Sequence, residues 1–104
     1  MHVVDVSNAE SVAAFCTAFT AAHERLDVLV NNAGITRDVR CLKAKDGEIK
    51  RMTLDNWQKV MDVNLTGTFL CAREAATWMV KKENPGVIVN ISSISREGNM
   101  GQTN

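Results

Sequence analysis

Residues 27–34 read Asp-Val-Leu-Val-Asn-Asn-Ala-Gly, and no other stretch of the chain limits the choice of fold so strongly. Three aliphatic residues follow an acidic one, and the pattern then stops at two amides, an alanine and a glycine. A short aliphatic run bounded by turn-forming residues is typical of a strand buried on both faces of a parallel sheet. We therefore expect an α/β fold with a parallel strand at residues 27–31.

The abrupt end of this strand is a candidate ligand site, because open α/β sheets bind ligands at the carboxyl ends of their strands. Ala33 and Gly34 have almost no side chain, so a flat ligand could lie directly on the backbone. Asn31 and Asn32 supply hydrogen-bond donors and acceptors without charge. The alternative interpretation is a polar turn that simply closes the strand.

The residues before this strand predict a β-α-β unit. Residues 2–6 resemble the end of a strand, and Ser7 and Glu10 have the spacing of a capping box at a helix N-terminus. Apolar residues at three- and four-residue spacing then predict a helix that ends near His23. Strand, helix and strand in this order form a crossover that is almost always right-handed.

A second buried parallel strand is predicted at residues 87–91, and it too ends abruptly, at Ser92 and Ser93. We expect it to pair in parallel with residues 27–31. The carboxyl ends of parallel neighbours lie at the same edge of a sheet, so the polar residues after both strands should converge there.

Residues 39–52 predict a short exposed β-hairpin. Asp46-Gly47 is a strong signal for a two-residue hairpin turn, and lysines alternate with apolar residues on both sides of it. Lysines on exposed strands discourage edge-to-edge aggregation. The alternative is that the same positive charges meet an acidic carrier or a phosphate tail.

Residues 54–82 are helical in period, with Thr53 as a plausible N-cap. Asn64 lies on the inward stripe, where an unbonded amide would cost roughly 1–3 kcal/mol, and Gly67 is expected to mark a bend. The amide either bonds its own backbone at the bend or holds a water or a catalytic side chain. An outer apolar face is expected at Leu54, Phe69, Leu70, Ala76 and Trp78.

The composition of the chain argues against several classes of function. The 104 residues suffice for one small domain and include 12 basic and 12 acidic side chains, so no nucleic-acid footprint is visible. No apolar run is long enough to span a membrane, and no signal peptide is recognisable near Met1. Cys16, Cys41 and Cys71 lack metal-like spacing and indicate reduced thiols in a cytoplasmic protein. The chain contains no tyrosine.

Four segments together resemble the short-chain dehydrogenase/reductase family, in the order that the family has them. They are the Asp-Val pair after the first strand, the Asn-Asn-Ala-Gly turn, the segment Val-Asn-Leu-Thr-Gly in the long helix, and Asn-Ile-Ser-Ser at the end of the second strand. The resemblance is closest to the 3-oxoacyl-[acyl-carrier-protein] reductase branch, with acetoacetyl-CoA reductase as a near neighbour, and it extends over essentially the whole chain.

The resemblance implies a partial Rossmann-type doubly wound parallel sheet, with the whole chain, 1–104, as the central part of one NAD(P)-binding domain and a small hairpin insertion near 39–52. It implies reduction of a 3-oxoacyl thioester, a step of fatty acid biosynthesis, with NADP as the cofactor and NAD as the alternative. Full-length relatives are expected to be dimers or tetramers through the 54–82 helix. The residues implied are Ser93 and Asn64 for catalysis, Asp5, Val6, Asn31, Ala33, Gly34, Val63 and Ile91 for cofactor binding, and none for a metal.

Two departures from the family pattern lead us to expect a fragment. The family's glycine-rich turn should precede residue 1, and its Tyr-x-x-x-Lys pair should follow Asn104. The loop after Ser93 is a residue shorter than is common, which leaves Ser92 as the alternative catalytic serine. The alternative function is a non-catalytic truncated product or a partner-binding remnant of such an enzyme.

Overall fold

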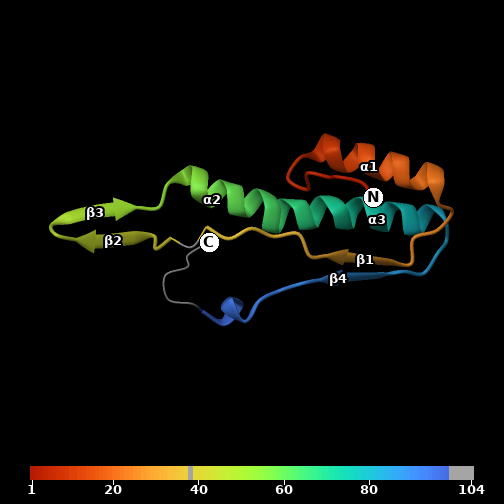
Figure 1. Ribbon diagram of the computed structural model, residues 1–104. Coiled ribbons are helices and arrows are strands. Elements are labelled where there is room, and N and C mark those ends of the chain that lie inside the picture. The colour runs from red at the N-terminus through yellow and green to blue at the C-terminus, as the bar shows by residue number, and fades with distance from the viewer. Residues whose placement is uncertain (38, 99–104) are drawn as a thin grey trace.

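Figure 1 shows the computed structural model, which describes residues 1–37 and 39–98. Helices lie along a pair of parallel strands, and a separate hairpin projects from one end of the molecule. Residues 99–104, over which the family resemblance also extends, lie outside the described part. In chain order the elements are α1 (Ala9–Ala22), β1 (Val28–Asn31), β2 (Leu42–Lys45), β3 (Glu48–Arg51), α2 (Leu54–Met61), η1 (Asp62–Thr66), α3 (Gly67–Lys81), β4 (Val87–Asn90) and η2 (Ile94–Glu97).

Strands β1 and β4 pair in parallel, as predicted, with Val28 opposite Val87 and Asn31 opposite Asn90. The chain between them passes through α2, η1 and α3. Burial on both faces was wrongly predicted, because the described helices cover only one face of the pair. Val28 and Val30 accordingly keep 53% and 54% of their surface exposed.

Residues 2–6 are not a strand in this structure, contrary to the prediction. A strand needs a neighbour to pair its backbone groups, and no described strand pairs with this segment. The capping box was also wrongly assigned. Asn8, not Ser7, is the N-cap of α1, and its Oδ1 accepts a hydrogen bond from Ser11 N–H at 2.9 Å.

The core lies where α3 packs against both α1 and β1. Its buried apolar side chains are Val12, Val60, Leu70, Ala75 and Met79. Leu70, at 6% exposure, was wrongly placed on an outer oligomer face, and Trp78 lines an internal cavity. Because α3 has two neighbours, its buried face is wider than the single stripe that the sequence period suggested. Leu54 and Phe69 do remain exposed.

The predicted continuous helix is interrupted at η1, a π-helical turn that ends where Gly67 N–H bonds to the Asp62 carbonyl. Such π turns are rare and occur frequently at functional sites. Sequence period does not reveal the extra residue of a π turn. The irregularity expected at Gly67 is therefore the π turn that immediately precedes it.

The hairpin β2–β3 is antiparallel, with Lys43 opposite Lys50 and Ala44 opposite Ile49. The turn residues Asp46 and Gly47 both have positive φ, 52° and 77°, as a two-residue turn of this kind requires. Within the residues that the structure describes, no helix has the length and apolar character needed to cross a membrane.

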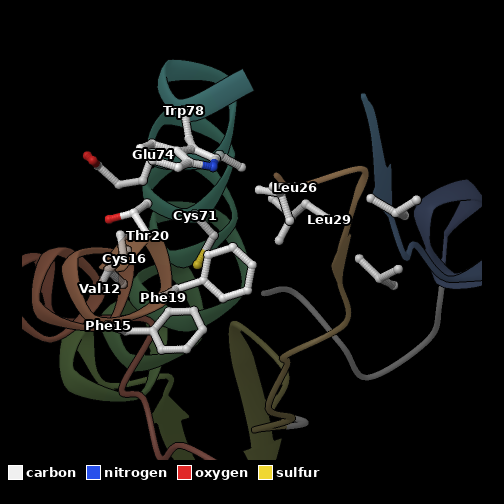
Figure 2. A pocket seen from close by; sticks show the side chains of 13 residues that line it. Val12, Phe15, Cys16, Phe19, Thr20, Leu26, Leu29, Cys71, Glu74 and Trp78 are labelled. Carbon is white, nitrogen blue, oxygen red and sulfur yellow. The ribbon is translucent and has the colours of Figure 1, made fainter. Parts of the chain in front are cut away.

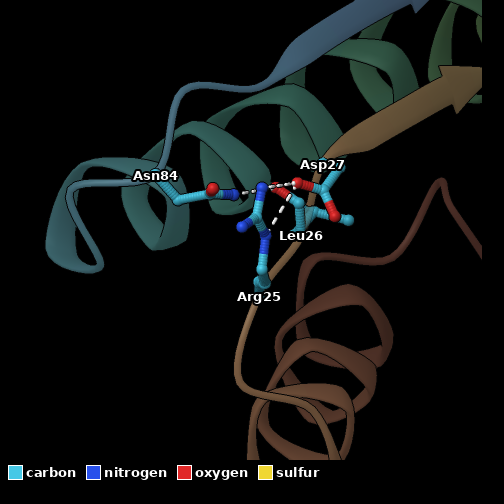
Figure 3. A network of polar contacts seen from close by, with 4 residues as sticks. All are labelled: Arg25, Leu26, Asp27 and Asn84. Carbon is cyan, nitrogen blue, oxygen red and sulfur yellow. Dashed lines mark hydrogen bonds and ion pairs between the residues drawn. The ribbon is translucent and has the colours of Figure 1, made fainter.

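A polar network joins the segment before β1 to the segment before β4, at the amino ends of the two strands (Figure 3). Asn84, after α3, donates through Nδ2 to the Leu26 carbonyl at 2.7 Å. Arg25 Nε donates to Asp27 Oδ1 at 2.9 Å, and this hydrogen bond holds the pKa of the Asp27 carboxyl below its usual value. Because the folded-state pKa is lowered, the contact adds stability at neutral pH and loses it as the pH falls through that pKa.

We expect Asn84→Ala to lower the free energy of unfolding of the full-length protein by about 1–2 kcal/mol, since it leaves the part-buried Leu26 carbonyl without its donor. Arg25→Ala is the matched control and should cost less, because exposed ion pairs contribute little and both partners are more than half exposed. Urea unfolding measures both. If both variants lost the same free energy of unfolding, Asn84 would not be the residue through which the network mainly stabilises the fold.

Candidate functional site

The carboxyl ends of β1 and β4 are joined by side chains as well as backbone. Asn31 Nδ2 donates a hydrogen bond to Asn90 Oδ1 at 2.9 Å. One residue further, Ile91 N–H donates to the Asn31 carbonyl at 2.9 Å. The Asn31 side chain, expected at a ligand site, therefore ties the two strands together where they end.

The Asn64 side chain forms two hydrogen bonds with the backbone of Ile35. Its Oδ1 accepts from Ile35 N–H at 2.9 Å, and its Nδ2 donates to the Ile35 carbonyl at 3.0 Å. The amide thus pairs with the chain just after Gly34 as a neighbouring strand would. The predicted bond to its own backbone is wrong, because the side chain bonds another segment's backbone. The alternative, that Asn64 holds a water or a catalytic side chain, stays a prediction. The π turn η1 is the element that carries Asn64 to this loop.

Val6 packs closely on Gly67 at the start of α3. A Cβ at residue 67 would lie 2.8 Å from Val6 Cγ2 and 3.1 Å from the Val6 carbonyl oxygen, so this approach requires glycine. Beside it lies a cavity of about 100 Å³ at the end of β1. Its walls include Val6, Asn31, Asn32, Ala33 and Gly67.

Asp5 holds the turn that leads into α1. Its Oδ1 accepts hydrogen bonds from the Ser7 hydroxyl at 2.6 Å and from Ser7 N–H at 3.0 Å. These bonds lower the pKa of the Asp5 carboxyl. The side chain is exposed, and its predicted contact with a cofactor stays a prediction.

Ser93 follows Ile91 by two residues and is the N-cap of η2. Its Oγ accepts a hydrogen bond from Ser95 N–H at 3.1 Å. A hydroxyl that accepts through its oxygen can still donate its proton elsewhere, so this arrangement is compatible with donation to a substrate oxygen. Ser92 is equally exposed, and the choice between the two serines stays a prediction. The segment after them, expected to be a loop, begins with the short 3-10 helix η2.

The structure places some of the predicted site residues close to one another. Val6, Asn31 and Ala33 line one cavity, and Gly34 is adjacent to Asn64, whose Oδ1 would lie 3.5 Å from a Cβ at residue 34. Val63 is half-buried in η1 and Ile91 is exposed; neither residue's binding role is tested.

Sequence reasoning missed two partners, Asn90 and Ile35. Asn90 could have been found, because an asparagine ends both aliphatic runs and parallel pairing places the two side by side. Ile35 contributes only backbone groups, which leave no signal in the sequence.

A larger cavity, of about 250 Å³, lies between α1, α3 and β1 (Figure 2). Its walls are mainly apolar. Trp78 Nε1 is buried with no hydrogen-bond acceptor among the described residues. Burial raises the pKa of the Cys16 and Cys71 thiols, which keeps them protonated and unreactive at neutral pH. This cavity is therefore a gap in the apolar core rather than a site of polar chemistry.

No cluster of three or more His, Cys, Asp or Glu side chains that could hold a metal occurs within residues 1–37 and 39–98.

Comparison with known proteins gives a consistent result. The family model described as short chain dehydrogenase matches residues 1–104. A 3-oxoacyl-[acyl-carrier-protein] reductase of Synechocystis is 44% identical over 101 residues, which cover 96% of this chain and 37% of the relative. The corresponding FabG reductase of Aquifex aeolicus is 49% identical over 80 residues, 76% of this chain and 29% of the relative. The chain thus spans less than two fifths of the length of each of these relatives.

Solved structures agree. The crystal structure of gox2181 superposes with a TM-score of 0.81 at 33% identity, covering 95% of this chain and 36% of that one. ElxO with NADP bound gives 0.76 at 32% identity, covering 95% and 37%. These likenesses confirm the predicted fold class, a partial Rossmann-type parallel sheet.

Proposed function

Because the chain belongs to the short-chain dehydrogenase/reductase family, we propose that the full-length protein reduces a 3-oxoacyl thioester to the 3-hydroxyacyl form with NADPH, or with NADH as the alternative. The observation that carries the proposal is the similarity to 3-oxoacyl-[acyl-carrier-protein] reductases along nearly the whole chain. The thioester is carried by acyl carrier protein or CoA. The protein is cytoplasmic and a homo-oligomer, and the exposed Leu54 and Phe69 belong to its contact between subunits.

The residues at the end of β1 fit a dinucleotide. Ala33 and Gly34 present almost bare backbone, and the adjoining cavity is walled by Val6 and the two asparagines of the turn. A flat ring could lie on this surface, and the family resemblance assigns Asp5, the residue before Val6, to the same cofactor. Bound there, the cofactor supplies a hydride to the carbonyl carbon. The cavity of about 100 Å³ would hold only part of the cofactor, so other segments of the full-length protein complete the site.

The reduction places negative charge on the substrate oxygen and then requires a proton, and the residues of this chain contribute to the first of these steps. Negative charge develops on the substrate oxygen during reduction, and the Ser93 hydroxyl stabilises it by donating a hydrogen bond. The oxygen must then receive a proton from a general acid. The family's acid is a tyrosine, which this chain does not contain, so the proton comes from another part of the full-length protein. Asn64, through Ile35, holds the turn under the cofactor in place.

The test uses the full-length protein with acetoacetyl-CoA and NADPH that carries deuterium at the transferable position of its nicotinamide. We expect 3-hydroxybutyryl-CoA with one deuterium bound to C3, detected by mass spectrometry. Oxidation of NADPH without that deuterated product, or no oxidation with any 3-oxoacyl thioester, would refute the proposed reaction.

The 104-residue chain by itself is expected to give no measurable reduction and to bind NADPH weakly. It lacks an internal tyrosine acid, and general acid catalysis is typically worth about 10²–10⁴-fold. Loss of NADPH absorbance, measured beside the full-length protein, checks this. Turnover by the short chain at a similar rate would mean that residues within it supply the acid.

A further inference from the structure

The hairpin β2–β3 stands apart from the rest of the molecule (Figure 1). All eight residues of its strands are exposed. Isolated two-stranded hairpins are only marginally stable in water. A hairpin so placed is well suited to contact something other than the body of this chain.

The two faces of the hairpin differ. Opposite residues of an antiparallel pair share a face, so Lys43, Lys45 and Lys50 lie on one face together with Glu48. The side chains of these four residues, with Asp46, line a shallow hollow of about 450 Å³. Leu42, Ala44 and Ile49 lie on the other face.

The lysine face has a net positive charge, because its three lysines share the hollow with two acidic side chains, Glu48 and Asp46. Lys43 lies directly opposite Lys50, an arrangement that destabilises a hairpin. None of the three lysines forms an ion pair with another residue of the described segments. Residues 40–51 hold five basic and two acidic side chains, whereas the whole chain balances 12 against 12. An acidic partner would relieve this repulsion.

The hairpin lies in sequence between the loop that contains Ile35 and the helix α2, which leads into η1 and Asn64. It begins a few residues after Ile35, which Asn64 holds, and it ends at Thr53, whose side chain caps α2. Met52 N–H donates to the Cys41 carbonyl at 2.9 Å and closes its base. The hairpin is therefore part of the connection between the loop that Asn64 holds and the helix that leads to Asn64.

From this position and charge we infer that the lysine face of the hairpin (Lys43, Lys45 and Lys50) docks an acidic surface of the carrier protein that presents the 3-oxoacyl group. The inference rests on the proposed reduction of a carrier-bound thioester, and it adds the surface that recognises the carrier. Attraction of this kind raises the rate of encounter and is weakened by salt.

The test compares Lys43→Glu/Lys50→Glu with the control Lys81→Glu/Lys82→Glu in the full-length protein. Both change the charge equally, and the control lies at the far end of α3. The probes are acetoacetyl-[acyl-carrier-protein], acetoacetyl-CoA and acetoacetyl-N-acetylcysteamine, which has neither carrier nor phosphate. We expect only the hairpin variant to lose about ten-fold or more in kcat/KM for acetoacetyl-[acyl-carrier-protein] at low salt. Its kcat/KM for this substrate should also depend less on salt than that of the wild type. Its kcat/KM for acetoacetyl-N-acetylcysteamine should not change. Carrier binding, measured by calorimetry, should weaken in parallel.

Each other outcome overturns the docking in a different way. An equal loss with acetoacetyl-CoA would mean that the face binds phosphate, and a loss with all three substrates would mean that the hairpin supports the fold. A change only in the concentration dependence of oligomerisation would assign the face to a second copy of the chain. If kcat/KM for the carrier substrate did not fall, the lysines would serve only to keep the exposed hairpin edge from aggregating. Glutamate side chains would do this equally well. Wild-type protein that reduces none of the three would refute the proposed function itself.

Discussion

Replacing Ser93 by alanine in the full-length enzyme is expected to lower kcat by about 10²–10³-fold, which is the usual cost of removing one hydrogen-bond donor to a developing oxyanion. KM for the thioester should change little, because the lost bond strengthens only as charge develops. Steady-state kinetics with acetoacetyl-CoA and NADPH measure both constants.

Two controls accompany this variant. Ser92→Ala should leave kcat nearly unchanged, and the reverse pattern would assign the role to Ser92. Ser93→Ala also removes the acceptor for Ser95 N–H that caps η2, a loss worth about 1 kcal/mol of stability. Urea unfolding separates this effect, since a lost cap shifts the unfolding midpoint without lowering kcat in the folded enzyme.

Asn64→Ala is expected to lower kcat/KM for NADPH by about 10²-fold, because a displacement of about 1 Å in a reacting site has a cost of this size. The variant loses both bonds to Ile35, and the turn at Ala33 and Gly34 is no longer held. Asn64→Asp keeps an acceptor for Ile35 N–H but turns a carboxylate toward the Ile35 carbonyl, so it should not restore activity.

Asn56→Ala makes the same change on α2, away from the cavity, and should alter kcat/KM less than two-fold. If Asn64→Ala behaved like Asn56→Ala, the Asn64–Ile35 pair would not be what positions the turn. The kinetic comparison is best made with the cofactor varied, because the expected defect lies in the surface beneath it.

The elements that the sequence predicted well are those with a local signature. Asp46-Gly47 supplies the two positive φ angles of the hairpin turn, and the aliphatic runs that end in Asn31 and Asn90 pair in parallel. The segment at residues 2–6 was wrongly predicted as a strand because strand formation depends on a neighbour. None of the described strands pairs with it.

The site was only partly predictable for a similar reason. The helical period placed Asn64 on the inward stripe, which is wrong because the residue is exposed, although its amide does have partners. The partners are backbone groups of Ile35, 29 residues away in sequence, and a π turn delivers the side chain to them. Neither a backbone partner nor a π turn has a pattern in side-chain hydrophobicity. The roles of Ser93 and Asp5 come from family resemblance and stay predictions.

The most direct test of the proposed site is a crystal structure of the full-length enzyme with NADP⁺ and an acetoacetyl thioester. We predict that Val6 and the turn at Ala33 and Gly34 contact the cofactor. We also predict that Ser93 Oγ lies about 2.5–3.0 Å from the substrate's 3-oxo oxygen, the distance of an O–H···O hydrogen bond. A cofactor bound away from the end of β1, or a 3-oxo oxygen held by other residues with Ser93 in solvent, would contradict the assignment.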